Sequence, residues 1–186
     1  MDRLYVALIA LLLGWGLSQL TEYVKSKQKT KKLKSAIELE LRDLEELLKQ
    51  RENTTKSSAL NYGHNHNYAF SLGAPISTPV LDAFYAEVAA SFTNEQRYNI
   101  RVFRDHIRAY SCIVEWAEEM GSGYATQNEI VFKLFEAYKQ ASFALVYIKE
   151  ANKVGGREKI ADDHESLNKL RASFKELTPK LALKES

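Results

Sequence analysis

A single apolar run at residues 4–20 (LYVALIALLLGWGLSQL) constrains this chain more than any other feature of its 186 residues. A helix of this length rises about 25 Å, slightly less than the roughly 30 Å hydrocarbon core of a bilayer. Tyr23 and Val24 lengthen the apolar surface, and lysine side chains beyond them can reach the headgroups. The sequence therefore predicts a transmembrane anchor over residues 1–24.

The charges on the two sides of this run differ, and they predict its orientation. Only Arg3 and the terminal amine precede it, whereas a lysine cluster follows it, formed by Lys25, Lys27, Lys29, Lys31, Lys32 and Lys34. Because positive charge stays on the cytoplasmic side of a membrane helix, we expect a single-pass protein of the bacterial inner membrane with its C-terminal domain in the cytoplasm. The alternatives for the same run are a cleaved signal peptide and a buried helix of a soluble protein, but Trp15 between Gly14 and Gly16 fits a cleavage site poorly.

Small side chains recur within the run at spacings of three and four residues. This spacing places on one helical face Ala7, Ala10, Gly14, Ser18 and Thr21. Lipid supplies no hydrophobic force between helices, so their association depends on close approach of the backbones along such faces. The pattern predicts a homo-oligomer that assembles in the membrane lipid. The alternative is a chance recurrence, because small residues are common in membrane helices.

Beyond the anchor the sequence divides into three further parts. Residues 25–52 combine the lysine cluster with an amphipathic helix, whose apolar face carries Leu33, Ile37, Leu41, Leu44 and Leu48. No proline or glycine separates this helix from the anchor, so one continuous helix is allowed. Residues 53–78 are polar and rich in turn-forming residues, and we expect an irregular loop there. Residues 79–180 return to helical periodicity and predict a cytoplasmic helical bundle.

Start signals divide this last part into four helices. Three of them open at Thr78 with Pro79, at Thr93 with Gln96, and at Thr126 with Glu129. We expect the fourth from about Arg157 to Leu177. The fold class is therefore all-α, an antiparallel bundle of four or five helices. The single cysteine, Cys112, lies in an apolar stretch, and we expect it in the core of a protein from a reducing compartment.

Four arginines follow one face of the helix expected from Thr93, at steps of four, three and four: Arg97, Arg101, Arg104 and Arg108. The row extends over about 16 Å. Guanidinium groups hold phosphates with paired hydrogen bonds, and Tyr98 beside the row offers a ring for base stacking. The pattern predicts an anion site for a nucleotide or an oligonucleotide. One alternative is contact with lipid headgroups. The other is ion pairing with acidic residues, either those between Glu38 and Glu46 or the nearer Asp105, Glu115, Glu118 and Glu119.

His64 and His66 form an H-x-H pair, whereas a zinc site needs at least one more protein ligand. His106, His164 and Asp163 have no local spacing to this pair, so we expect no metal site and no cofactor. The sequence also lacks a P-loop, a dinucleotide fingerprint, a nucleophile elbow and a zinc-protease motif. We therefore expect a protein that is not an enzyme. The alternative is a membrane-bound, metal-dependent enzyme that uses the histidine pair.

In its layout, a short membrane span followed by a compact helical domain, the chain resembles small single-span membrane effectors of bacterial anti-phage defence systems. The resemblance covers the plan of the chain and no motif. It implies a homo-oligomeric, channel-like effector of the inner membrane, whose cytoplasmic domain senses an anionic ligand or a partner protein. The alternative function is that of a non-catalytic adaptor, which docks a cytoplasmic protein partner at the membrane.

Overall fold

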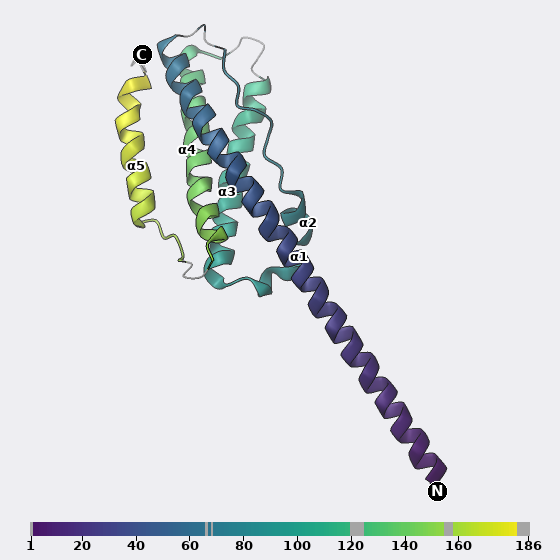
Figure 1. The fold of residues 1–186 in the computed structure, drawn as a ribbon. Helices are drawn as coiled ribbons and strands as arrows, with labels where there is room; N and C mark the ends of the chain where they lie inside the picture. The colour runs from purple at the N-terminus through teal and green to yellow at the C-terminus, as the bar shows by residue number, and fades with distance from the viewer. Residues whose placement is uncertain (1, 66, 68, 120–124, 155–157, 182–186) are drawn as a thin grey trace.

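In the computed structural model, residues 2–65, 67, 69–119, 125–154 and 158–181 are described. The regular structure of these residues is entirely helical. The elements are α1 (Asp2–His64), α2 (Pro79–Val88), the 3-10 turn η1 (Ala89–Ser91), α3 (Asn94–Glu119), α4 (Gln127–Asn152), α5 (Glu165–Leu177) and the 3-10 turn η3 (Thr178–Leu181). The predicted all-α bundle is confirmed (Figure 1).

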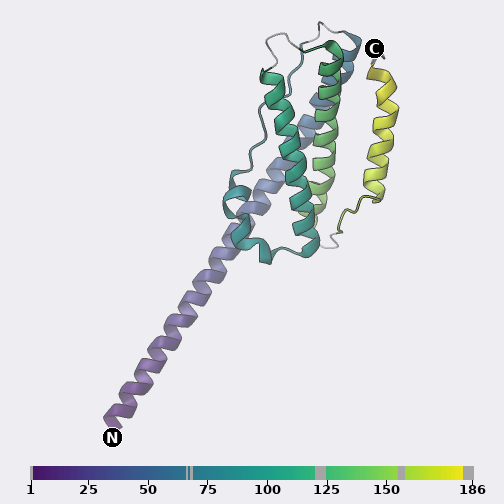
Figure 2. The same ribbon diagram turned by 180° about the vertical axis from the view of Figure 1, so that it is seen from behind.

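The first helix, α1, is unbroken over 63 residues. At 1.5 Å per residue it is about 95 Å long. Its C-terminal half lies in the bundle, and its N-terminal half projects away from it (Figures 1 and 2). The chain has no proline or glycine between Leu17 and Tyr62, so nothing there interrupts the backbone hydrogen bonds. The continuity between residues 2–24 and the amphipathic helix, which the sequence allowed, is confirmed.

The expectation of an irregular loop from residue 53 is wrong for its first half, because α1 continues to His64. Thr55, Ala59 and Tyr62 are buried at helical spacing and extend the apolar face of the preceding turns. The hydroxyl of Thr55 donates to the backbone carbonyl of Arg51 at 2.7 Å, which allows a polar residue to be buried there. Because this buried face includes small polar side chains, its periodicity is hard to recognise in the sequence.

Two glycines that suggest turns in the sequence have different roles in the fold. Gly63 lies inside α1, where an added Cβ would come within 2.6 Å of the carbonyl oxygen of Leu181, so it permits η3 to pack closely. Gly73 has a φ of +71°, a conformation that favours glycine. A Cβ at Gly73 would also collide with the guanidinium of Arg51, which donates to the carbonyl of Leu72 at 3.0 Å. Arg51 thereby fixes the loop that follows α1.

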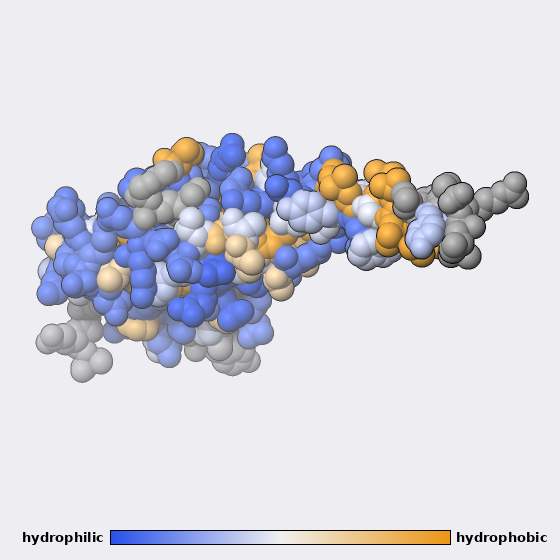
Figure 3. Space-filling model, turned by 90° about the horizontal axis from the view of Figure 1, so that it is seen from below, coloured by the Kyte–Doolittle hydropathy of each residue, from blue (hydrophilic) through white to orange (hydrophobic). Residues whose placement is uncertain are grey.

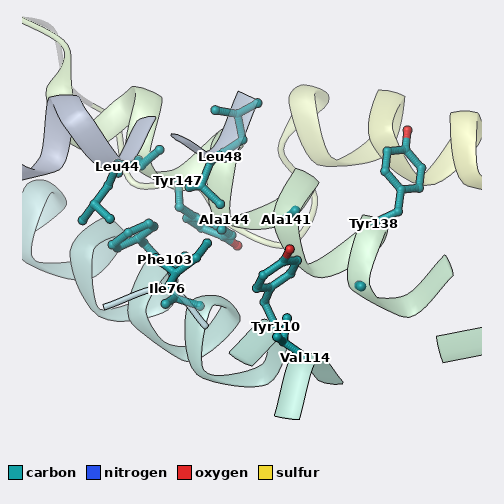
Figure 4. Packing of buried hydrophobic residues seen from close by; sticks show 14 of the residues in the cluster. Leu44, Leu48, Ile76, Phe103, Tyr110, Val114, Tyr138, Ala141, Ala144 and Tyr147 are labelled. Carbon is teal, nitrogen blue, oxygen red and sulfur yellow. The ribbon is translucent and has the colours of Figure 1, made fainter. Parts of the chain in front are cut away.

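The core forms around α4, which packs against both α1 and α3. Figure 4 shows side chains of these three helices, among them Leu44 and Phe103, gathered in one cluster. The contact faces of α4 carry small buried residues at Ala137, Ala141, Ala144 and Ala151, so the neighbouring backbones can approach closely. α5 packs against the outer side of α4, where Tyr138 and Phe174 meet edge to face with centroids 5.4 Å apart.

The start of α4 agrees with its sequence signal, whereas the start of α5 does not. Thr126 and Glu129 form a reciprocal capping box, with the Thr126 N–H donating to Oε2 of Glu129 at 2.8 Å. α5 begins at Glu165, several residues later than expected, and His164 caps it by accepting from the N–H of Ser166 at 3.2 Å. The preceding residues are held instead by a buried amide.

That amide belongs to Asn99 of α3, which is completely buried. Its Nδ2 donates to the carbonyl of Glu158 at 2.7 Å, and its Oδ1 accepts from the N–H of Ile160 at 3.2 Å. Asn99 therefore satisfies two backbone groups of an extended segment, as a neighbouring strand would. This pairing explains why the chain is not helical there.

The short helix α2 begins where the sequence predicts, but another helix caps it. The side chain of Thr78 makes no capping bond, and its hydroxyl donates to the carboxylate of Asp82 at 2.8 Å. The carboxylate of Glu40 in α1 accepts instead from the N–H groups of Val80 at 2.9 Å and Leu81 at 2.6 Å. A negative charge at this end also interacts favourably with the helix dipole. α2 is therefore tied directly to α1.

The expected transmembrane span stays a prediction. Among the described residues, no helical stretch is both long enough and apolar enough to cross a membrane. Part of the expected span lies outside the described set, namely the side chains of Leu4, Val6, Ile9 and Ala10.

The cap on α2 predicts a stability effect for Glu40→Ala, which removes both acceptors. Hydrogen bonds to a charged group contribute about 1.5–3 kcal/mol, and we expect a loss of that size in the free energy of unfolding. Urea unfolding of the full chain, followed by circular dichroism, measures it. Asp43 is an exposed acidic residue of the same helix, and Asp43→Ala should stay within about 0.5 kcal/mol of the wild type. Equal losses in the two variants would contradict the capping role.

Glu45 predicts a pH dependence of stability. Burial alone would raise the pKa of its carboxyl, but hydrogen bonds from Asn152 and Lys49 outweigh burial and lower the pKa below its ordinary value of 4.5. A lowered carboxyl pKa stabilises the fold fully above its unfolded-state value, and this contribution is lost as the pH falls through the folded-state pKa. We expect the Tm to decrease below about pH 4.5, and to decrease less steeply in Glu45→Gln. Parallel curves for the two proteins would refute this assignment.

Candidate functional site

All four arginines of the predicted row line one open groove on the surface of the bundle, between α3 and α2. The groove has a volume of about 560 Å³. Its walls are formed by Tyr85, Ala89, Asn94, Arg97, Tyr98, Arg101, Arg104, Asp105 and Arg108. Every residue that the sequence assigns to an anion site therefore contributes to this one surface. Whether it binds an anion stays a prediction.

One wall of the groove is formed by a face of α3, and the other lies on the side of α2. Successive arginines fall three or four residues apart on α3, so their side chains leave the helix on one side. The facing wall is formed by Tyr85 of α2 and Ala89 of η1. Besides Glu40, an ion pair between Lys29 and Glu87, at 2.7 Å, links α2 to α1. Tyr85 could not be assigned to this site from the sequence, because nothing in its local pattern places it opposite the arginine row.

Two of the four arginines have carboxylate partners. Arg104 pairs with Asp82 of α2, and Arg108 Nη1 lies 3.7 Å from Asp105 Oδ1 on its own helix. The interhelical ion pairing that the sequence allowed is therefore present at one position. Its acidic partner comes from α2 and not from the acidic stretch of α1.

The other two arginines are held by neutral groups. The guanidinium of Arg97 contacts the side-chain oxygen of Asn94, and that of Arg101 lies 5.5 Å from the ring centroid of Tyr98. Within the described part of the chain, neither Arg97 nor Arg101 has a carboxylate at ion-pair distance. Their positive charges are available to an incoming anion.

A further positive charge, that of Lys159, lies beside Tyr98 in the groove. The ammonium of Lys159 lies 4.5 Å from the centroid of its ring, in addition to the guanidinium of Arg101. Cation–π contacts of this kind hold long flexible side chains near one place. Lys159 comes from the segment that Asn99 fixes, and the sequence gives no sign that this segment returns to α3.

Two opposing effects act on the pKa of the Tyr85 hydroxyl, namely burial and the charges of nearby arginines. Burial raises the pKa of this hydroxyl above 10.0, while the charges of Arg97, Arg104 and Arg101 act in the opposite direction. With a raised pKa the hydroxyl stays protonated at neutral pH and can donate a hydrogen bond to an anion in the groove. The groove therefore combines several positive charges with a neutral donor.

A smaller hollow of about 200 Å³ adjoins the groove at Arg104 and Arg108, which line both. Thr78, Asp82 and Ser111 add polar groups to its wall. The hydroxyl of Ser111 already accepts from a loop N–H, that of Ile76, at 3.2 Å. The positive surface thus continues past the ion pair of Arg104, and the carboxylate of Asp82 lies at the junction.

The expectation that Cys112 is buried is wrong, because its side chain is exposed. Cys112 follows Arg108 by one turn on the outer side of α3, whereas Tyr110 and Val114 face the core. The apolar residues around it in the sequence therefore lie on the opposite face of the helix.

The described histidines, His64, His106 and His164, have different surroundings. His64 is the last residue of α1, and His66 lies outside the described residues. Nδ1 of His106 lies 2.7 Å from Oε1 of Gln140, and His164 caps α5. Among the described residues, no three histidine, cysteine or acidic side chains lie close enough together to hold a metal ion.

The face of small residues lies on the projecting half of α1. Its members Ala7, Gly14, Ser18 and Thr21 are exposed, and the side chain of Ala10 lies outside the described set. Apart from the backbone of α1 itself, no described atom lies within 4 Å of a Cβ built on Gly14. In the single chain the surface around Gly14 is therefore open.

The chain matches no protein-family model, no curated protein and no solved structure at a significant level. A functional assignment therefore depends on the chemistry of the arginine groove and of the projecting half of α1.

The exposure of Cys112 predicts that a maleimide reagent labels the native protein. One label per chain is expected without denaturant, because the sulfur is accessible and the chain has no second cysteine. Intact-mass spectrometry after a short reaction measures the stoichiometry. Labelling that begins only after unfolding would place Cys112 in the core and would contradict the orientation of α3.

Proposed function

We propose that this protein is a homo-oligomeric, membrane-anchored effector whose helical domain binds a phosphate-bearing ligand, a nucleotide or an oligonucleotide, in the arginine groove. The observation that carries the proposal is the convergence of four arginines on one groove, with Arg97 and Arg101 free of carboxylate partners among the described residues. Ligand binding on the domain would then regulate the assembly that its anchor forms.

The chemistry of the groove favours phosphate over other anions. A guanidinium presents paired N–H donors that match two phosphate oxygens, and it is always charged. Arg97 and Arg101 are four residues apart, so two such groups face the groove about 6 Å apart along the helix axis. Tyr85 adds a neutral donor on the opposite wall. A ligand with more than one phosphate can contact both arginines.

The projecting half of α1 supports the membrane part of the proposal. Large apolar side chains are exposed along it, among them Leu11 at 70% and Leu17 at 65%. Figure 3 shows hydrophobic side chains on the projecting end, whereas the visible face of the bundle is mostly hydrophilic. An apolar surface of this extent marks a membrane or a protein interface. The lysine cluster at the boundary would place the domain in the bacterial cytoplasm.

The open face of small residues supports the homo-oligomer. Because no described residue fills the space beside Gly14, a second α1 can approach it there. The layout that the chain shares with membrane effectors of anti-phage systems is the basis for calling it an effector. A channel-like assembly is the extension of this proposal to several copies of α1.

The ion pair of Arg104 favours a second candidate function, that of a membrane-tethered adaptor. A carboxylate, that of Asp82, already occupies one arginine of the groove. An acidic segment of a cytoplasmic protein partner would present the same group to Arg97 and Arg101. The groove would then be a docking surface, and oligomerisation would not be needed.

Binding by the full-length protein in a neutral detergent, measured by calorimetry, tests the proposal. The probes are ATP, a deoxythymidine tetranucleotide and a pentaglutamate peptide. We expect a phosphate-bearing probe to bind in a salt-dependent manner, and Arg97→Glu with Arg101→Glu to weaken it about tenfold or more. The control is Arg42→Glu, because Arg42 is an exposed arginine of α1. Asp82→Asn should tighten binding by releasing Arg104.

The outcomes separate the two functions. Preference for pentaglutamate over both phosphate probes would replace the ligand-binding proposal with the adaptor. No binding of any probe, or equal weakening by Arg42→Glu, would contradict an anion site in the groove.

A further inference from the structure

A second hollow, of about 670 Å³, lies where α1 leaves the bundle. The first residues of its wall, Tyr23 and Val24, are apolar or aromatic, and Lys27, Lys31 and Lys34 follow one to three turns later. Ser91 of η1 closes the wall from the side of the bundle. The hollow is separate from the arginine groove and shares no residue with it.

Lys34 is held by groups of the bundle, whereas Lys27 and Lys31 are free of carboxylate partners among the described residues. The ammonium of Lys34 donates to the carbonyl of Ser91 at 2.9 Å and lies 5.1 Å from the ring centroid of Phe92. Neither Lys27 nor Lys31 has a carboxylate at ion-pair distance among the residues that the structure describes, and the ammonium of Lys27 lies 6.0 Å from the ring centroid of Tyr23. Lys34 thus links α1 to η1, while the ammonium groups of Lys27 and Lys31 can still bind an anion.

The free lysines continue an apolar stripe. At 3.6 residues per turn, Leu20, Val24, Lys27 and Lys31 fall on one side of α1. Leu20 is 59% exposed and Val24 is 43% exposed. Along this side of α1 the apolar residues are therefore followed by lysines, at the place where the helix meets the bundle. Lys25 and Lys32 belong to the same cluster but lie on the other side of the helix.

We propose that this hollow is a binding site for an anionic phospholipid, with the lipid phosphate between Lys27 and Lys31 and an acyl chain along Val24 and Leu20. The proposal rests on the membrane anchoring proposed above. It goes beyond a general attraction of the lysine cluster to anionic membranes, because it assigns the lipid to one side of α1.

The composition of the hollow favours a lipid over a free phosphate ion. An inorganic anion uses the ammonium groups alone, whereas an acyl chain also covers the exposed apolar stripe. The order along the helix, apolar residues first and lysines nearer the bundle, is the order of chain and headgroup in a leaflet. Lipid binding would also fill the space between α1 and η1 and hold the bundle at a fixed angle to the membrane surface.

Two double variants with the same change in net charge test the site. Lys27→Ala with Lys31→Ala removes the free lysines of the hollow, and Lys25→Ala with Lys32→Ala removes the matched pair on the other side. Each full-length protein is reconstituted in vesicles of equal parts phosphatidylglycerol and phosphatidylcholine and extracted gently. Native mass spectrometry then measures the ratio of the two lipids retained. Flotation with vesicles of phosphatidylcholine alone measures anchoring separately.

We expect the wild type and the Lys25/Lys32 variant to retain phosphatidylglycerol in preference. The Lys27/Lys31 variant should lose most of this preference, a change of about thirtyfold for two charges near a lipid surface. Equal loss in both variants, no preference in the wild type, or displacement of the lipid by inorganic phosphate would overturn the lipid site while leaving the anchor intact. Failure of the wild type to float with phosphatidylcholine vesicles would overturn the anchor and the lipid site together.

Discussion

The unbroken backbone of α1 is the constraint on which the other features depend. One half of this helix supplies the buried face on which α4 packs, and the same half carries Glu40, which caps α2. The other half leaves the bundle with its apolar side chains exposed. A continuous helix is stiff over these lengths, so whatever holds the projecting half also sets the position of the bundle.

The short helix α2 contacts both the arginine groove and α1. α2 forms one wall of the arginine groove through Tyr85, and its Asp82 pairs with Arg104. It is joined to α1 at two places, through Glu40 at its N-terminus and through Glu87, which pairs with Lys29. An anion that competes with Asp82 for Arg104 therefore acts on an element that α1 holds directly, close to the point where α1 leaves the bundle.

Helical periodicity made much of this fold predictable from the sequence. The apolar face of residues 33–48, the capping box at Thr126 and the convergence of the arginines all follow from spacing along one helix. Contacts between distant segments could not be predicted in this way. Glu40 on the end of α2 and Lys159 over Tyr98 each join residues far apart in the chain, and no local pattern signals them. For the same reason, buried hydroxyls such as that of Thr55 concealed the last three turns of α1.

The central claim is that α1 carries its apolar half into a bilayer as a rigid continuation of the bundle. Spin labels on single cysteines at Leu12 and Lys27, introduced in a Cys112→Ser background and reconstituted in vesicles, measure it through their accessibility to oxygen and to a water-soluble nickel complex. The account predicts that the label at position 12 is accessible to oxygen and protected from nickel, whereas the label at position 27 is accessible to nickel. Equal nickel accessibility at both positions would contradict it.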